Sequence, residues 1–110
     1  MSASDTIVLL SAQTTDVSGT AKNFTYSNHK ACVKIAGVFG GATVALQVSF
    51  PTGVLASTWL PLKDRNGTLV SATTAGVFFL EDIVYDDQIR AVVTSSSGTT
   101  SLSCTMQPTG

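Results

Sequence analysis

The stretch Ala42-Thr-Val-Ala-Leu-Gln-Val-Ser-Phe50 decides the fold, because a large apolar side chain occupies every second position in it. Val44, Leu46, Val48 and Phe50 fall on one side of an extended chain, and the residues between them fall on the other. A period of two is typical of a β-strand with one face in the core and one in solvent. The sequence therefore predicts a half-buried strand, which the following proline ends because it cannot donate to a ladder.

Turn signals on either side of this strand divide the rest of the chain. Gly40-Gly41 predicts a hairpin just before it. Asn66-Gly67 predicts a second hairpin, closed by a type I′ turn in which both central residues have positive φ. Val77 to Leu80, an unbroken apolar run, predicts a central strand buried on both faces. Trp59 is expected in the core.

The remaining predicted strands are short and alternate apolar with polar residues. A helix is expected only as a short turn near Ala72 to Gly76. The other predicted strands are Thr6 to Ala12 (an edge strand), Thr20 to Tyr26, Ala31 to Ala36, Gln88 to Thr94 and Thr100 to Gln107, with turns at Asp16 to Gly19, Ser27 to Lys30, Pro51 to Gly53, Asp86-Asp87 and Ser95 to Gly98.

The composition agrees with strands throughout. Val, Ile and Thr make up 32 of the 110 residues, and there is a single glutamate, Glu81. β-branched side chains fit a pleated sheet better than a helix. About eight strands at roughly ten-residue spacing predict an all-β, antiparallel β-sandwich, immunoglobulin-like or jelly-roll. The prediction is one domain over residues 1–110, with residues 1–6 as an N-terminal arm.

Charged residues are scarce, and this excludes several classes of function. Asp, Glu, Lys and Arg make up 12% of the chain and its net charge is −1, against about 25% charged residues in an ordinary domain. No charge lies between Lys34 and Lys63, and none follows Arg90. Without a basic patch, neither nucleic-acid nor membrane binding is expected. With no secretory signal or long apolar segment visible, we expect the chain to be made in the cytoplasm.

The residues that usually carry catalysis or bind metal form no motif. The single histidine, His29, lies in a polar turn, where we expect it to be solvated. The acidic group Glu81, Asp82, Asp86 and Asp87 could bind Ca²⁺ through its oxygens, but it lacks the spacing of a calcium loop and is expected to be a solvated turn. We therefore predict no enzyme, no catalytic residue, no metal site and no cofactor.

The two cysteines differ in their predicted surroundings. Alternation groups Cys104 with Leu102 and Met106 on a core-facing side, and groups Cys32 with Lys34 on a solvent-facing side. A bridge between them would need a bulge to bring both to the same side. Free thiols are the favoured prediction, and a disulfide remains the alternative.

A surface with so few charges suggests that neighbouring molecules cover much of it. Soluble proteins usually protect a sheet edge with lysine, proline or a bulge, and the last predicted strand has no charge. We expect this strand and the N-terminal arm to contact partners; an ordinary Ser/Thr-rich surface is the alternative. The predicted contact residues are Met1, Ser2, Ala3, Ser4, Asp5, Thr6, Thr100, Leu102, Cys104 and Met106.

Three segments resemble a known group of proteins. They are Ile35-Ala-Gly-Val-Phe-Gly-Gly-Ala-Thr-Val-Ala-Leu-Gln-Val-Ser49, Ser57-Thr-Trp-Leu-Pro-Leu62 and Gln88-Ile-Arg-Ala-Val-Val93. Their order resembles small β-sandwich virion proteins of tailed phages, over about Val33 to Gln107. One departure is the segment Phe50-Pro-Thr-Gly-Val-Leu55, where a D-G-T turn often precedes the tryptophan in that group.

The resemblance implies a structural role in a virion. It implies a capsid decoration, or cement, protein that binds the outside of the shell, forms homo-oligomers and has the major capsid protein or other virion proteins as partners. A tail, neck or fibre subunit is the alternative within this class. A carbohydrate-binding module, with Trp59 and Tyr85 as a stacking platform, is the alternative from another class.

Overall fold

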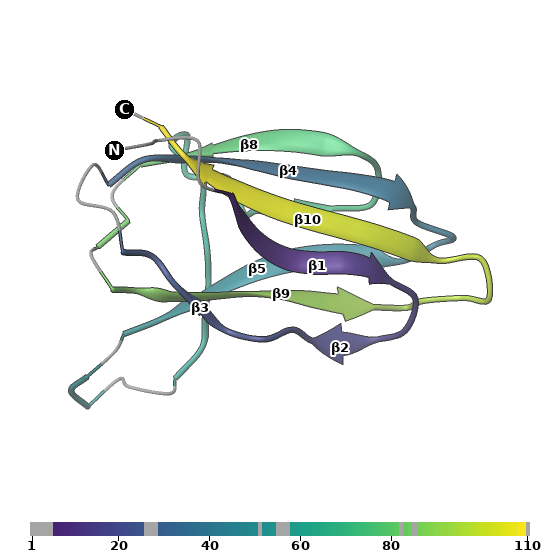
Figure 1. Ribbon diagram of the computed structural model, residues 1–110, viewed down its shortest axis with the longest axis horizontal. Helices are drawn as coiled ribbons and strands as arrows, with labels where there is room; N and C mark the ends of the chain where they lie inside the picture. The colour runs from purple at the N-terminus through teal and green to yellow at the C-terminus, as the bar shows by residue number, and fades with distance from the viewer. Residues whose placement is uncertain are drawn as a thin grey trace.

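The computed structural model describes residues 6–25, 29–50, 52–54, 58–81, 83–84 and 86–109, and every regular element within these ranges is a β-strand. The strands form two antiparallel sheets packed together around one core (Figure 1). The predicted all-β, antiparallel sandwich is confirmed. The strands are β1 (Ile7–Gln13), β2 (Val17–Ser18), β3 (Lys22–Asn23), β4 (Ala31–Val38), β5 (Thr43–Ser49), β6 (Leu60–Pro61), β7 (Ser71–Ala72), β8 (Gly76–Leu80), β9 (Gln88–Thr94) and β10 (Ser101–Pro108).

The four-stranded sheet has the order β1-β10-β4-β8. β10 pairs with β4 along its whole length, from Ser101 opposite Val38 to Pro108 opposite Ala31. β1 lies at the edge, as predicted, and its register with β10 shifts twice. The consecutive Leu9 and Leu10 are both buried, which strict alternation does not allow, and a shift in register resolves this.

The second sheet is built on β5 and β9, which pair from Thr43 opposite Thr94 to Ser49 opposite Gln88. Two-residue strands flank this pair on both sides: β2 and β3 pair with β9, while β6 and β7 pair with β5. Ile89, Ala91 and Val93 of β9 are buried, as their alternation predicts.

The core lies between the sheets and takes every second residue of the long strands. On β4 and β10, Val33, Ile35, Leu102, Cys104 and Met106 are at most 1% exposed. Phe24, just after β3, is fully buried although its strand is only two residues long. The other buried apolar residues are Leu9, Leu10, Ala31, Phe39, Ala42, Val44, Leu46, Val70, Ala72, Leu80, Ile83, Ile89, Ala91 and Val93.

The segment before Phe24 differs from its prediction. The predicted turn at Asp16 to Gly19 contains β2, and the predicted strand Thr20 to Tyr26 is reduced to β3, with Tyr26 outside the described residues. Gly19 donates its N–H to the Ala91 carbonyl at 2.7 Å. A Cβ at Gly19 would lie 2.8 Å from that oxygen, so this glycine serves a close approach to β9 and not a turn.

Gly40 and Gly41 do not close the predicted hairpin. They form a turn with positive φ of 58° and 92°, but β4 and β5 belong to different sheets, so this turn carries the chain across the sandwich. The connection from β9 to β10 crosses beside it. The Thr100 hydroxyl joins the two connections by donating to the Phe39 carbonyl at 2.8 Å.

The predicted central strand at Val77 to Leu80 is also wrong, because β8 is an edge strand. Val77 and Phe79 are 51% and 45% exposed, while Leu80 is buried. An unbroken apolar run looks the same in the sequence whether its outer face meets water, a neighbouring strand or a partner protein.

The hairpin at Asn66-Gly67 is confirmed, but its turn type is not. Gly67 has a φ of 78°, whereas Asn66 is not among the residues with positive φ, so this is no type I′ turn. The Asp64 carboxylate accepts from the N–H groups of Asn66 and Thr68 at 2.8 and 3.0 Å. Gly67 N–H donates to the Asp64 carbonyl, which matches a type I turn followed by a left-handed glycine.

Candidate functional site

The partner-contact residues predicted at the last strand do not lie on the surface. β10 is an inner strand, and Thr100, Leu102, Cys104 and Met106 are at most 3% exposed. That part of the prediction is wrong, because the last strand in the sequence is not the last strand in the sheet. Thr6 is exposed, and Met1, Ser2, Ala3, Ser4 and Asp5 lie outside the described residues.

Both edges of the four-stranded sheet are protected. At β8, the Arg65 N–H donates to the Phe79 carbonyl at 2.9 Å, and the Arg65 guanidinium lies 4.9 Å from the centre of the Phe79 ring. At β1, register shifts interrupt the ladder. Both devices are typical of edges that avoid pairing with other chains. Contact with a partner is therefore better sought on the faces of the sheets than at these edges.

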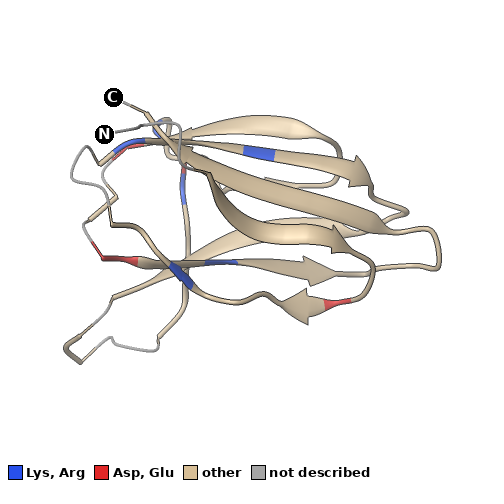
Figure 2. Ribbon diagram, viewed as in Figure 1, with Lys and Arg blue, Asp and Glu red and all other residues tan. Residues whose placement is uncertain are grey.

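The outward side of the four-stranded sheet is almost free of charge. Among the residues of its four strands, Lys34 alone is charged (Figure 2). One row across the sheet places Val8 beside Thr105, Lys34 and Val77, and the next places Gln107 beside Cys32 and Phe79. We call this surface the sheet face; its residues are Val8, Cys32, Lys34, Ala36, Val77, Phe79, Ser101, Ser103, Thr105 and Gln107.

Large apolar side chains on the sheet face are open to solvent. Val8, Val77 and Phe79 are 46%, 51% and 45% exposed. A hollow of about 260 Å³ lies between them, lined by Cys32, Lys34, Thr105, Gln107, Pro108 and Thr109. Cys32 is half-buried there and Cys104 is fully buried; both are free thiols, as the favoured prediction had it.

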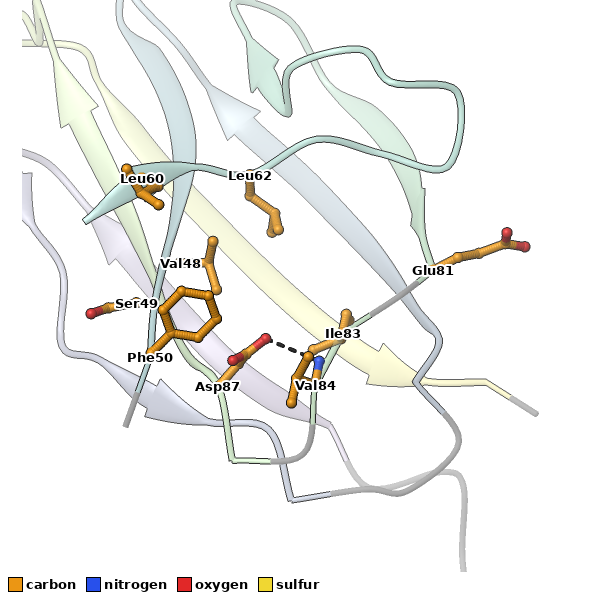
Figure 3. Close-up of a pocket in the computed structure, with 9 residues that line it drawn as sticks. All are labelled: Val48, Ser49, Phe50, Leu60, Leu62, Glu81, Ile83, Val84 and Asp87. Atoms are coloured by element: carbon orange, nitrogen blue, oxygen red, sulfur yellow. Dashed lines mark hydrogen bonds between the residues drawn. The ribbon is translucent and has the colours of Figure 1, made fainter. Parts of the chain in front are cut away.

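A second candidate site is a pocket of about 270 Å³ between the end of β5, β6 and the connection from β8 to β9 (Figure 3). Its walls are mainly apolar, and Phe50 and Leu60 are 41% and 42% exposed. Phe50 was predicted to share the buried face of its strand; at the strand's end it lines the pocket instead. The lining residues are Val48, Ser49, Phe50, Leu60, Leu62, Glu81, Ile83, Val84 and Asp87.

Asp87 is the unexpected residue of this pocket. The pair Asp86-Asp87 was predicted to be a solvated turn, and a turn is present, but Asp87 is only 5% exposed. One carboxyl oxygen, Oδ2, accepts from the Val84 N–H at 3.0 Å, and Oδ1 is buried with no hydrogen-bond partner among the described residues. Desolvation raises the pKa of this carboxyl above its ordinary value. The turn signal in the sequence gave no indication of this burial.

The connection from β8 to β9 is fixed by backbone contacts to neighbouring segments. His29, at a positive φ of 60°, places its Nδ1 2.7 Å from the Ile83 carbonyl, and its own carbonyl accepts from the Ile83 N–H at 3.1 Å. The predicted solvated histidine is exposed but holds this connection in place. Of the acidic group, Asp82 lies outside the described residues, and the described residues contain no cluster of three or more potential metal ligands.

Trp59 was predicted to lie in the core, and this prediction is wrong. It is half-buried, and the Arg90 guanidinium stacks 4.2 Å from the centre of its ring. Arg90 also donates through Nε to Gln47 Oε1 at 2.8 Å, and these two residues are register partners on β9 and β5. The stacking occupies one face of the indole ring. Tyr85, the other residue of the predicted platform, lies outside the described residues.

Comparison of the chain with protein-family models, with curated proteins and with solved structures finds no match. Within the described residues, no helix is long and apolar enough to cross a membrane.

Proposed function

We propose that the chain is a non-enzymatic structural subunit of a phage particle, and specifically a capsid decoration protein that binds the outside of the shell. Three segments of the sequence resemble small virion proteins of tailed phages, and this resemblance supports a phage particle as the place of the chain. The observation that supports a contact role is the sheet face, a broad β-surface that exposes Val8, Val77 and Phe79. Lys34 is the one charged residue of its strands, and the Arg65 guanidinium lies over the Phe79 ring at its edge.

The sheet face has the chemistry of a protein interface. The centres of interfaces are poor in charged residues and rich in aromatic ones, because burying a charge without a partner is costly. Phe79 and Val77 on β8 would be the apolar anchors of the contact, and the hydroxyl side chains of β10 would lie on the far side of β4 from them. A stable interface buries about 800 Å² on each partner, roughly a seventh of this chain's 5828 Å² surface.

The role on the particle is mechanical. The partner is the major capsid protein, and many copies of this chain, as a homo-oligomer, bridge neighbouring coat subunits. Weak individual contacts become strong together, because linked binding sites add avidity without any new contact. Such a role needs no titrating or nucleophilic group.

Co-sedimentation with empty shells tests this proposal. We expect the native chain to sediment with the shells and Val77→Lys to bind them at least about tenfold more weakly, because the variant places an unpaired charge in the buried contact. Val54→Lys is the matched control, since Val54 is 99% exposed and outside the sheet face. Undiminished binding by Val77→Lys, or an equal loss of binding in both variants, would show that the sheet face does not contact the shell.

Tail, neck or fibre subunits would make the same kind of contact, and the same two variants can be tested against purified tails. The half-buried Trp59 keeps a carbohydrate-binding module as the second candidate, with the sugar on the ring face opposite Arg90. The test is the quenching of Trp59 fluorescence by a soluble quencher, measured with and without oligosaccharides. Weaker quenching in the presence of oligosaccharides would favour that function, and unchanged quenching would speak against it.

A further inference from the structure

The pocket at the end of β5 combines apolar walls with one unsatisfied carboxylate oxygen. Burying an ionised carboxyl is costly unless hydrogen bonds or an opposite charge compensate it. Asp87 is compensated on one side only, where Oδ2 accepts from the Val84 N–H. Oδ1 has no hydrogen-bond partner among the described residues. Glu81 also lines the pocket, but its carboxyl group points away from Asp87 (Figure 3).

Figure 3 shows the Asp87 carboxyl between Phe50 and Val84. Phe50 and Val84 are 41% and 53% exposed, so they are outer parts of the wall, and a ligand would displace them slightly to reach Oδ1. The volume of about 270 Å³ lies below the range of roughly 300–1,000 Å³ typical of drug-sized ligands. The pocket therefore suits a single side chain better than a cofactor.

We propose that this pocket receives a lysine side chain from a partner protein. The methylene stem would lie against Val48, Phe50 and Leu60, and the ammonium group would donate to Asp87 Oδ1. Lysine stems pack on apolar surfaces in this way while their charge is satisfied at the tip. Arginine fits less well, because its planar group favours two parallel bonds to a carboxylate and Oδ2 is already engaged by Val84.

This assignment goes beyond the proposed function, since it names a second contact and the chemistry of the partner at it. Ser49 also supports the binding of a polar group at this place. Its Oγ is buried without a hydrogen-bond partner among the described residues, and Ser49 also lines the pocket.

The test uses small probes and needs no shells. Nα-acetyl-lysine N-methylamide and its norleucine and arginine counterparts are titrated into the full-length chain, and the amide signals of Ser49, Val84 and Asp87 are followed by two-dimensional NMR. We expect the lysine probe to shift these signals at concentrations at least about tenfold lower than either counterpart, because only it offers a single compact cation on an apolar stem.

Two variants separate the carboxylate from general charge effects. Asp87→Asn can still accept from the Val84 N–H and should bind the lysine probe no better than the norleucine probe. Asp16→Asn, which removes a carboxylate bound to the Ser96 N–H outside the pocket, should behave like the native chain.

Equal shifts from the lysine and norleucine probes, equal or tighter binding of the arginine probe, or unchanged binding of the lysine probe by Asp87→Asn would each overturn the assignment. The probe comparison in the native chain decides the question even if Asp87→Asn fails to fold, and a negative result leaves shell binding through the sheet face intact.

Discussion

Burial sets the chemistry of the few ionisable side chains that this protein places inside. Desolvation raises the pKa of Cys104 to about 12, so its thiol stays protonated and behaves as a small apolar group in the core. Desolvation also raises the pKa of Asp87, against the opposing effect of the Val84 N–H. Asp16 is the contrasting case, because hydrogen bonds from Ser96 lower the pKa of its carboxyl.

These opposite shifts predict opposite dependences of stability on pH. The folded state holds the Asp87 proton more tightly than the unfolded chain does. The free energy of unfolding that depends on Asp87 therefore falls as the pH rises from the ordinary value of 3.8 through the raised pKa. Because Asp87→Asn cannot titrate, its stability relative to the native chain should increase with pH over this window, as measured by urea unfolding.

Asp16→Asn is the control for this measurement. The lowered pKa of Asp16 gives stability that is present above 3.8 and is lost as the pH falls. Relative to the native chain, this variant should therefore gain stability as the pH falls. Differences that do not change with pH in either variant would contradict the assigned environments.

At the scale of elements, long alternating strands could be predicted and short ones could not. The regions of β9 and β10 were found because each buries every second residue over at least seven positions. β5 was found from the same apolar alternation, although at its end Ser49 is buried and Val48 is only partly buried. The two-residue strands β2, β3, β6 and β7 owe their pairing to β5 and β9, which lie far from them in the sequence. Local pattern carries no information about such a partner.

Turns showed the same limit. Gly40-Gly41 marked a turn correctly, but glycine content does not tell whether the next strand joins the same sheet or the opposite one. The pocket was missed for a similar reason: it is built from the end of β5, from β6 and from the β8–β9 connection, which only the folded chain brings together.

Two glycines provide a test of backbone packing between β4 and β10. Gly37 has a φ of 124°, and a Cβ there would lie 2.2 Å from the Ser101 carbonyl oxygen; Gly41 has a φ of 92° and nothing within 4 Å of its Cβ position. Backbone strain costs about 1–3 kcal/mol at either site. We expect Gly37→Ala to lower the free energy of unfolding by at least about 2 kcal/mol more than Gly41→Ala, because only Gly37→Ala adds a clash with backbone. Equal losses in chemical denaturation would show that β4 and β10 are not packed this closely.

For the whole molecule, the scarcity of charge suggested covered surfaces, but the sequence placed them on the wrong elements. The last strand was expected at an edge, whereas it lies between β1 and β4 and its alternate side chains form the core. Among the described residues, most of the exposed large apolar side chains instead lie on the sheet face and around the pocket, where Val77, Phe79, Phe50 and Leu60 are 41–51% exposed. Each of these surfaces is assembled from several segments that are far apart in the sequence, so the pattern of one strand could not predict it.

If the sheet face lies against the shell, as we propose, the thiol of Cys32 reports the contact. Cys32 is half-buried within the sheet face, and Cys104 is inaccessible in the core. Alkylation with iodoacetamide, followed by mass spectrometry, should modify Cys32 and leave Cys104 unmodified in the free protein. On shells saturated with the chain, Cys32 should become protected from alkylation. Alkylation of Cys32 at the same rate in the bound and the free chain would contradict it.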